Sequence, residues 1–194
     1  MRKFFEGICN LLAEENTVIS LEIKKELDGF ILGKDFNFCS NKITSNVSSE
    51  VVHLLKMSKH SLAKEIIEAE KCLQWRKTTI PSSLIAEEVS NLFYVCPIIG
   101  IDTFTSSEKY RLGLLYQKPN SYYPLHNHNA VETYVVIGGE LDWTDGIEKR
   151  KLNVGDVIHH PSLIPHAFTT GQSGFLGLWH WSGDISPESY KVLE

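Results

Sequence analysis

The glycines of this chain are distributed unevenly, and their distribution constrains the possible fold more than any other feature. The sequence has 194 residues and 13 glycines, most of which follow residue 95, at positions 100, 113, 138, 139, 146, 155, 171, 174, 177 and 183. Between them lie short runs rich in β-branched and aromatic residues, such as YRLGLLYQ, ETYVVIGGELDWT, DVIHHP, HAFTT and FLGLWHWS. Short runs of this kind, separated by turn residues, are typical of an antiparallel barrel or jelly roll.

The first half of the chain has a helical period instead. RKFFEGICNLLAEE and VISLEIKKELDGFIL both carry apolar residues at helical spacing. The run SSEVVHLLKMSKHSLAKEIIEAEKCLQW has no glycine or proline and predicts one long helix or two shorter ones, and Pro81 is expected to open another. The sequence therefore predicts an α+β protein, in which a helical region (1–95) packs on one end of a β-barrel (96–194).

Charge and composition exclude several classes of partner. The net charge is −5 and no basic block is present, so we expect no binding to nucleic acid. The longest apolar run, at 92–101, is too short to cross a bilayer, and glutamates interrupt the N-terminal apolar residues, so neither a membrane span nor a signal peptide is expected. The cysteines have no CxxC spacing and are expected to be reduced thiols of a cytoplasmic protein: Cys9, Cys39, Cys72 and Cys96. A homodimer is one assembly that the helical half could support.

The stretch HNHNAVETY, residues 126–134, contains a candidate metal site. A β-strand directs alternate side chains to one face, so His126, His128 and Glu132 can share that face with Tyr134. His166 follows a Gly-Asp turn and a proline and supplies a fourth ligand from a later hairpin. These residues predict a site for one divalent ion of Zn, Fe, Mn, Ni or Co that leaves positions open for a substrate.

Two further histidines, His159 and His160, are adjacent in the sequence. Adjacent residues of a strand face opposite ways, so at most one of them could approach the metal. We expect both to be structural.

The spaced residues resemble the paired motifs of the cupin superfamily. The second motif departs from the usual cupin form at Leu163, where cupins often have glycine, and at Thr170, where they often have asparagine. The match is closer to one branch, the cupin-type dimethylsulfoniopropionate lyases, and it covers most of the chain. The segments that carry this resemblance are LQW at Trp75, LGLLYQKP, YPLHNHNAVETYVVIGGELDW, GDVIHHPSLIPHAFTT and LWHWSGD.

The resemblance implies specific roles. The metal ligands of the family fall on His128, Glu132 and His166, with Tyr134 close to the metal or bound to it, and Tyr123 and His126 match further active-site positions. The implied substrate is a small zwitterionic carboxylate, dimethylsulfoniopropionate, although relatives of such lyases can act on other molecules.

The implied reaction needs a strong base. Dimethylsulfoniopropionate is cleaved by β-elimination: a base removes the proton α to the carboxylate, and dimethyl sulfide leaves to give acrylate. A cation beside a phenol lowers its pKa, and Tyr134 is two residues from the ligand Glu132, so Tyr134 is the leading base. Tyr123 is second, because Pro124 breaks the regular strand and can turn Tyr123 inward. His126 is the candidate if neither phenol serves.

Aromatic faces bind a sulfonium cation, which has no hydrogen-bond donor. Trp179 and Trp181 share a strand face, and Tyr122, Tyr123 and Phe168 are available nearby. Core packing explains each tryptophan, taken singly, at least as well. Two other functions stay open: a cupin dioxygenase that uses Fe(II) and oxygen, and a non-enzymatic cupin that binds a small anion. Tyr134 and the aromatic set favour the lyase, since an oxygenase does not need them.

Overall fold

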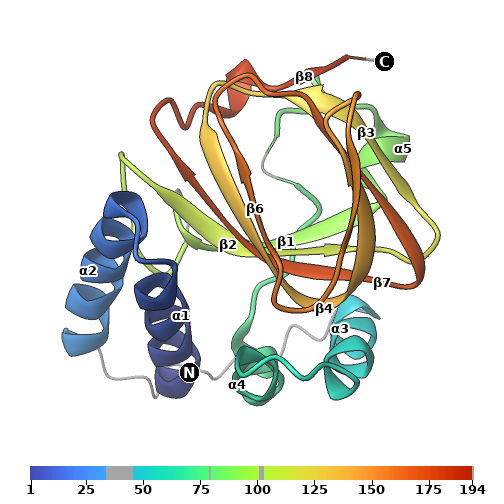
Figure 1. Cartoon of the computed structure of the whole chain (residues 1–194). Helices are drawn as coiled ribbons and strands as arrows, with labels where there is room; N and C mark the ends of the chain where they lie inside the picture. Colours follow the sequence, from blue (N-terminus) through green and yellow to red (C-terminus); the bar gives the residue numbers. More distant parts are fainter. Residues whose placement is uncertain (34–45, 79, 101–102, 194) are drawn as a thin grey trace.

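The computed structural model describes residues 1–33, 46–78, 80–100 and 103–193. Figure 1 shows helices α1 to α4 gathered at one end of a strongly curved sheet, with the C-terminus at the other end. The helical elements are α1 (Arg2–Glu15), α2 (Val18–Leu32), α3 (Asn46–Lys56), α4 (Leu62–Ala69), the 3-10 turn η2 (Glu70–Cys72) and the four-residue α5 (Glu87–Ser90). The long helical run of the sequence is therefore two helices.

The helix expected to open at Pro81 does not begin there, and only the short α5 (Glu87–Ser90) forms in the segment that follows. The amide of Leu84 donates to the carbonyl of Pro81 at 2.9 Å, and this turn is not continued. Ile85 is buried in the barrel interior, and Ile80 and Leu84 pack against the same cluster. Burying these side chains across an irregular segment overrides the helical preference of the local sequence.

The strands differ from the sequence expectation in two respects. They are β1 (Phe93–Ile99), β2 (Arg111–Gln117), β3 (Tyr122–Asn127), β4 (Val131–Thr144), β5 (Lys149–Leu152), β6 (Val157–His160), β7 (His166–Ser182) and β8 (Lys191–Val192), with the 3-10 turn η3 (Pro187–Ser189) before the last. Strand β1 begins three residues before the expected start of the barrel. HAFTT and FLGLWHWS form one strand, β7, because β4 pairs with β7 along the whole length of β4. The register of this pairing shifts around Gly138 and Gly139.

All paired strands are antiparallel and belong to one sheet. Its main order is β1-β2-β7-β3-β8, and β4 pairs with β5, β6 and β7. Among the described strands no ladder joins β1 to β5 or β6, so the sheet wraps into a jelly roll without complete closure. The predicted class, a helical region packed on an antiparallel jelly roll, is confirmed.

Alternate residues of the central strands pack into two different cores. On β2, Leu112 and Leu114 contact the helices, and Leu115 faces the interior of the barrel. On β7, Leu178 belongs to the helical core, whereas Trp179 belongs to the interior. Both sides of these strands are therefore buried. The helices cover the outer face of the sheet, and the inner face can carry buried polar residues.

Two expectations concern the chain as a whole. Cys9 and Cys96 are free and buried, but Cys72 is disulfide-bonded, so the expectation of reduced thiols is wrong for this residue; Cys39 lies outside the described residues. None of the helices in the described parts of the chain is long and apolar enough to cross a membrane.

Candidate metal centre

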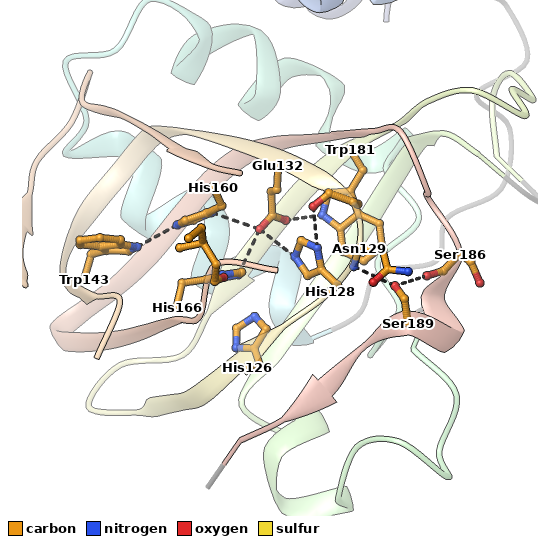
Figure 2. A network of polar contacts seen from close by, with 12 residues as sticks. His126, His128, Asn129, Glu132, Trp143, His160, His166, Trp181, Ser186 and Ser189 are labelled. Carbon is orange, nitrogen blue, oxygen red and sulfur yellow. Dashed lines mark hydrogen bonds and ion pairs between the residues drawn. The ribbon is translucent and has the colours of Figure 1, made fainter. Parts of the chain in front are cut away.

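Glu132 lies on the inner face of the barrel at a position set by strand register. Across one ladder of β4 it is opposite His160 of β6, and across the other it is opposite Trp181 of β7. All three side chains are buried. The carboxylate of Glu132 is therefore flanked by an imidazole and an indole (Figure 2).

Three ligand atoms converge at this carboxylate. His128, Glu132 and His166 each contribute one ligand atom, and these atoms lie within 4.8 Å of one another. Oε2 of Glu132 is 3.3 Å from Nε2 of His128 and 3.2 Å from Nε2 of His166. Figure 2 shows both rings directed at the carboxylate from different segments of the chain. Two imidazoles and one carboxylate form a ligand set that suits a divalent transition metal.

Backbone carbonyls fix the tautomers of the imidazoles of His128 and His166. Nδ1 of His128 lies 3.0 Å from the carbonyl of Ala130, and Nδ1 of His166 lies 3.0 Å from the carbonyl of Ile164. A carbonyl only accepts, so each Nδ1 carries the hydrogen, and Nε2 of each neutral ring keeps its lone pair. This is the usual second contact of a metal-binding histidine.

The resulting arrangement places acceptors opposite each other. The Nε2 lone pairs of His128 and His166 face Oε2 of Glu132. Nε2 of His166 is buried and has no hydrogen-bond partner among the described residues. Such atoms repel one another unless a proton or a metal ion lies between them. Without a metal, a proton on Nε2 of His128 makes the 3.3 Å hydrogen bond to Oε2 of Glu132. The residues therefore fit a bound divalent metal.

The pKa values of Glu132 and His128 are both shifted by their surroundings. Burial opposes the charge of Glu132, but the close contacts with His128, His160 and His166 outweigh it and hold the pKa of Glu132 well below 4.5. Burial also lowers the pKa of His128, but the hydrogen bond with Glu132 outweighs it and raises that pKa above 6.5. Glu132 is consequently negative at neutral pH, and a metal must displace a proton that His128 holds more tightly than a free histidine does.

His126 lies beside the three ligands without belonging to their group. It is opposite His166 across the β3–β7 ladder, with ring centroids 4.2 Å apart. Its Nδ1 lies 2.7 Å from the carbonyl of Pro124. Burial is the main cause that lowers the pKa of His126 well below 6.5, and the nearby His166 lowers it further, so the ring is neutral. Its role as a fourth ligand stays a prediction.

The neighbouring tyrosines of β3 face opposite ways. Tyr123 is buried and stacks on His126, with centroids 4.2 Å apart and planes 22° apart. The register of β3 against β7 shifts between these two residues, so an odd and an even position both face inward. Tyr122 is 43% exposed and lines a groove on the outer surface beside Lys149 and Arg150, away from the ligands.

Tyr134 lies on the inner face, two residues after Glu132. Its ring is buried and packs edge-on against Phe168, with centroids 5.3 Å apart. Burial, and then the charge of Glu132, raises the pKa of Tyr134 well above 10, so the phenol is neutral beside these residues alone. Phe168 packs behind Tyr134 and does not line the cavity next to the ligands.

That cavity has a volume of about 40 Å³. It is bordered by His126, His128 and Glu132, by Tyr123 and Tyr134, and by Trp179 and Trp181. At roughly 10–15 Å³ for each molecule it has room for a few waters. The two indole rings have centroids 5.8 Å apart. Nε1 of Trp181 donates to Oε1 of Glu132, whereas Nε1 of Trp179 is buried with no partner in the described part of the chain.

Three residues at the site were not found from the sequence. His160 was expected to be structural, yet its Nδ1 lies 3.4 Å from Oε2 of Glu132. Trp143 donates from Nε1 to Nε2 of His160 at 2.8 Å. Its odd position faces inward because the register shift between Val136 and Gly138 adds a residue to β4 and reverses the alternation. Tyr190, whose ring lies 5.1 Å from that of His126, comes from an irregular C-terminal segment that carries no periodic signal.

Comparison with known proteins identifies a family and a curated relative of this chain. A family model described as dimethylsulfoniopropionate lyase matches residues 41–177. The curated dimethylsulfoniopropionate lyase DddQ of Ruegeria pomeroyi is 34% identical over 128 residues, which cover 66% of this chain and 62% of that relative. The match therefore spans less than two thirds of the length of the relative.

Solved structures with the same fold include two enzymes. The crystal structure of DddQ from Ruegeria pomeroyi has a TM-score of 0.62 and 24% identity, and the likeness covers 97% of this chain and 96% of that chain. The polyketide cyclase RemF of Streptomyces resistomycificus has a TM-score of 0.50 and 17% identity, over 63% of this chain and 80% of that chain. At these identities the likenesses establish the fold.

Proposed function

The chain belongs to the dimethylsulfoniopropionate lyase family, and on this basis we propose that it is a metal-dependent carbon–sulfur lyase. Its substrate is dimethylsulfoniopropionate or a similar β-substituted carboxylate, cleaved by β-elimination to acrylate and dimethyl sulfide. The observation that carries this proposal is the convergence of His128, Glu132 and His166, next to a buried cavity that His128, Glu132 and Tyr134 line.

His128, Glu132 and His166 would hold one divalent transition metal ion, with His126 as a fourth ligand. The bound cation would supply a Lewis acid for the substrate carboxylate and would favour the phenolate form of the adjacent Tyr134. The raised pKa of His128 and the lowered pKa of Glu132 support a site in which a cation replaces a shared proton.

Tyr134 is the proposed base. Its oxygen takes the proton α to the substrate carboxylate, and the electrons of that C–H bond form the new carbon–carbon double bond. The bond from the β carbon to sulfur breaks at the same time, and its electron pair leaves with dimethyl sulfide. Tyr134 then returns the proton to solvent. Tyr123 and His126 are weaker candidates. Tyr123 lies on β3, whereas Tyr134 shares β4 with Glu132, and His126 has a strongly lowered pKa.

The aromatic wall of the cavity suits the rest of the substrate. Trp179 and Trp181 offer faces for the sulfonium cation, which has no hydrogen-bond donor. Phe168 and Tyr122 are less suited to this role, since Phe168 lies behind Tyr134 and Tyr122 borders an outer groove. A cavity of about 40 Å³ must widen to admit such a substrate, so side chains at its border have to move.

The experiment that tests this proposal is an anaerobic assay of the purified, metal-loaded protein with dimethylsulfoniopropionate. We expect dimethyl sulfide in the headspace and an equal amount of acrylate in solution. Product that forms only in the presence of oxygen would favour the Fe(II) dioxygenase. Saturable binding of small carboxylates without any turnover would favour the non-enzymatic anion-binding cupin.

The cytoplasmic location and the homodimer remain predictions. Gel filtration with light scattering measures the mass of the assembly directly. A monomeric mass at the protein concentration of the assay would contradict the predicted homodimer.

A further inference from the structure

We propose that His160 is a positioning residue that holds Glu132 in its metal-binding orientation through a hydrogen bond from Nδ1, and that Trp143 selects the tautomer that makes this possible. This inference rests on the proposed metal site and assigns a function to two residues that the ligand set and the base do not use. It concerns the geometry and affinity of the site rather than the chemical step.

The first observation is the contact between His160 and the metal-binding carboxylate. Nδ1 of His160 is buried without a hydrogen-bond partner among the described residues, and it lies 3.4 Å from Oε2 of Glu132, the oxygen that also faces the rings of the two histidine ligands. His160 is completely buried, and β4–β6 pairing puts it directly opposite Glu132. The other oxygen, Oε1, accepts from Nε1 of Trp181. Trp181 thus holds one oxygen of the carboxylate, and a slightly closer approach of the His160 ring would hold the other, which would fix which oxygen faces the ligands.

The second observation is the contact on the far side of the imidazole. Nε1 of Trp143 lies 2.8 Å from Nε2 of His160, and both side chains are buried. An indole N–H is only a donor, so Nε2 of His160 has to be the acceptor. In the neutral ring the hydrogen then lies on Nδ1, where it points at Glu132. Trp143 thus converts His160 into a hydrogen-bond donor toward the carboxylate.

The tautomer distinguishes His160 from the histidine ligands. His128 and His166 give their Nδ1 hydrogens to backbone carbonyls and present lone pairs to the site. His160 presents an N–H instead, so it cannot serve as a ligand in this state. A carboxylate oxygen has two lone-pair directions, and one of them can accept from His160 while the other binds the metal.

The stacking of His160 on a ligand adds rigidity. Its ring lies parallel to that of His166, with centroids 3.9 Å apart and planes 9° apart. The same ring therefore constrains two ligands, one by hydrogen bonding and one by packing. Figure 2 shows the continuous line of contacts from Trp143 through His160 to Glu132.

The test separates hydrogen bonding from packing by three substitutions. His160→Leu removes the donor and keeps an apolar side chain. His160→Asn places an amide N–H near the position of Nδ1 and should restore the bond to Glu132. Trp143→Phe keeps a ring but removes the donor that selects the tautomer. The affinity of each variant for Zn²⁺ is measured by competition with a chromophoric chelator.

We expect His160→Leu to weaken Zn²⁺ binding by about 10–100-fold, the usual effect of losing a hydrogen bond to a metal ligand. His160→Asn should stay within about threefold of wild type, and Trp143→Phe should fall between the two. The matched control is His159→Asn, since the adjacent His159 is exposed, bonds Thr133 on the outer face of the sheet and should leave the affinity unchanged.

A second measurement reads the tautomer directly and needs no metal. Long-range ¹⁵N–¹H correlation spectra of the wild type should report His160 with its hydrogen on Nδ1, and Trp143→Phe should shift this state toward a mixture. A hydrogen on Nε2 in the wild type would overturn the inference, even if His160→Leu does not fold. A folded His160→Leu variant that binds Zn²⁺ as tightly as wild type would also overturn it and leave the lyase proposal intact. A wild type that binds no Zn²⁺ or other divalent ion would overturn both.

Discussion

Replacing Tyr134 with phenylalanine removes one hydroxyl from the site and leaves the ring in place. The ring is 5% exposed and packs against Phe168 and Phe175, contacts that phenylalanine retains. Loss of a hydroxyl that interacts with Glu132 should change the free energy of unfolding by about 1 kcal/mol or less. Loss of a general base should lower the rate by about 10²–10⁴-fold, or roughly 3–5 kcal/mol in the barrier.

The assay follows dimethyl sulfide in the headspace and metal content in the same sample. Tyr134→Phe should keep its metal, since the ligands remain, and should lose any exchange of the α hydrogens of the substrate with deuterium from solvent. Tyr123→Phe is the matched control, because Tyr123 is equally buried at the same cavity. Near-full turnover by Tyr134→Phe, together with an inactive Tyr123→Phe, would refute the assignment of the base. Full turnover by both would leave His126 as the remaining candidate.

Three further predictions concern the metal and the fold. Elemental analysis should find about one divalent ion per chain in wild type and less than about a tenth of that in each ligand variant: His128→Ala, Glu132→Ala and His166→Ala. Metal affinity should fall as pH is lowered, beginning above pH 6.5, because the raised pKa of His128 lets protons compete earlier than at a free histidine, and a pH-independent affinity would contradict this. Gly139→Ala should destabilise the fold by at least about 2 kcal/mol in urea unfolding, because φ is +76° and a Cβ would lie 2.1 Å from the carbonyl oxygen of Gly174. Gly155→Ala, at φ +94° with open space around it, should cost less.

The alternation of a strand was enough to predict part of the site. Glu132 and Tyr134 lie two residues apart on β4 and both face the cavity, as period-2 spacing requires. The break at Pro124 also turned Tyr123 inward, as the sequence indicated. His166 was found because a turn and a proline precede it. In each case the information is local, within a few residues of the side chain.

What the sequence did not reveal depends on pairing between distant strands. The rule for adjacent residues said that His159 and His160 face opposite ways, but only the register of β6 against β4 decides that His160 faces Glu132. Trp143 reaches the site because a register shift between Val136 and Gly138 reverses the alternation of β4, which no short-range pattern encodes. The helix expected at Pro81 failed for a related reason, because packing on the barrel outweighed local preference.

The central claim is that one divalent ion, held by His128, Glu132 and His166, is required for β-elimination. The most direct measurement removes all metal with a chelator, adds back a single metal in steps and records the rate of dimethyl sulfide release against bound metal. The account predicts an inactive stripped protein whose rate rises in proportion to bound metal and levels off at about one ion per chain. Undiminished release of dimethyl sulfide by the stripped, folded protein would contradict it.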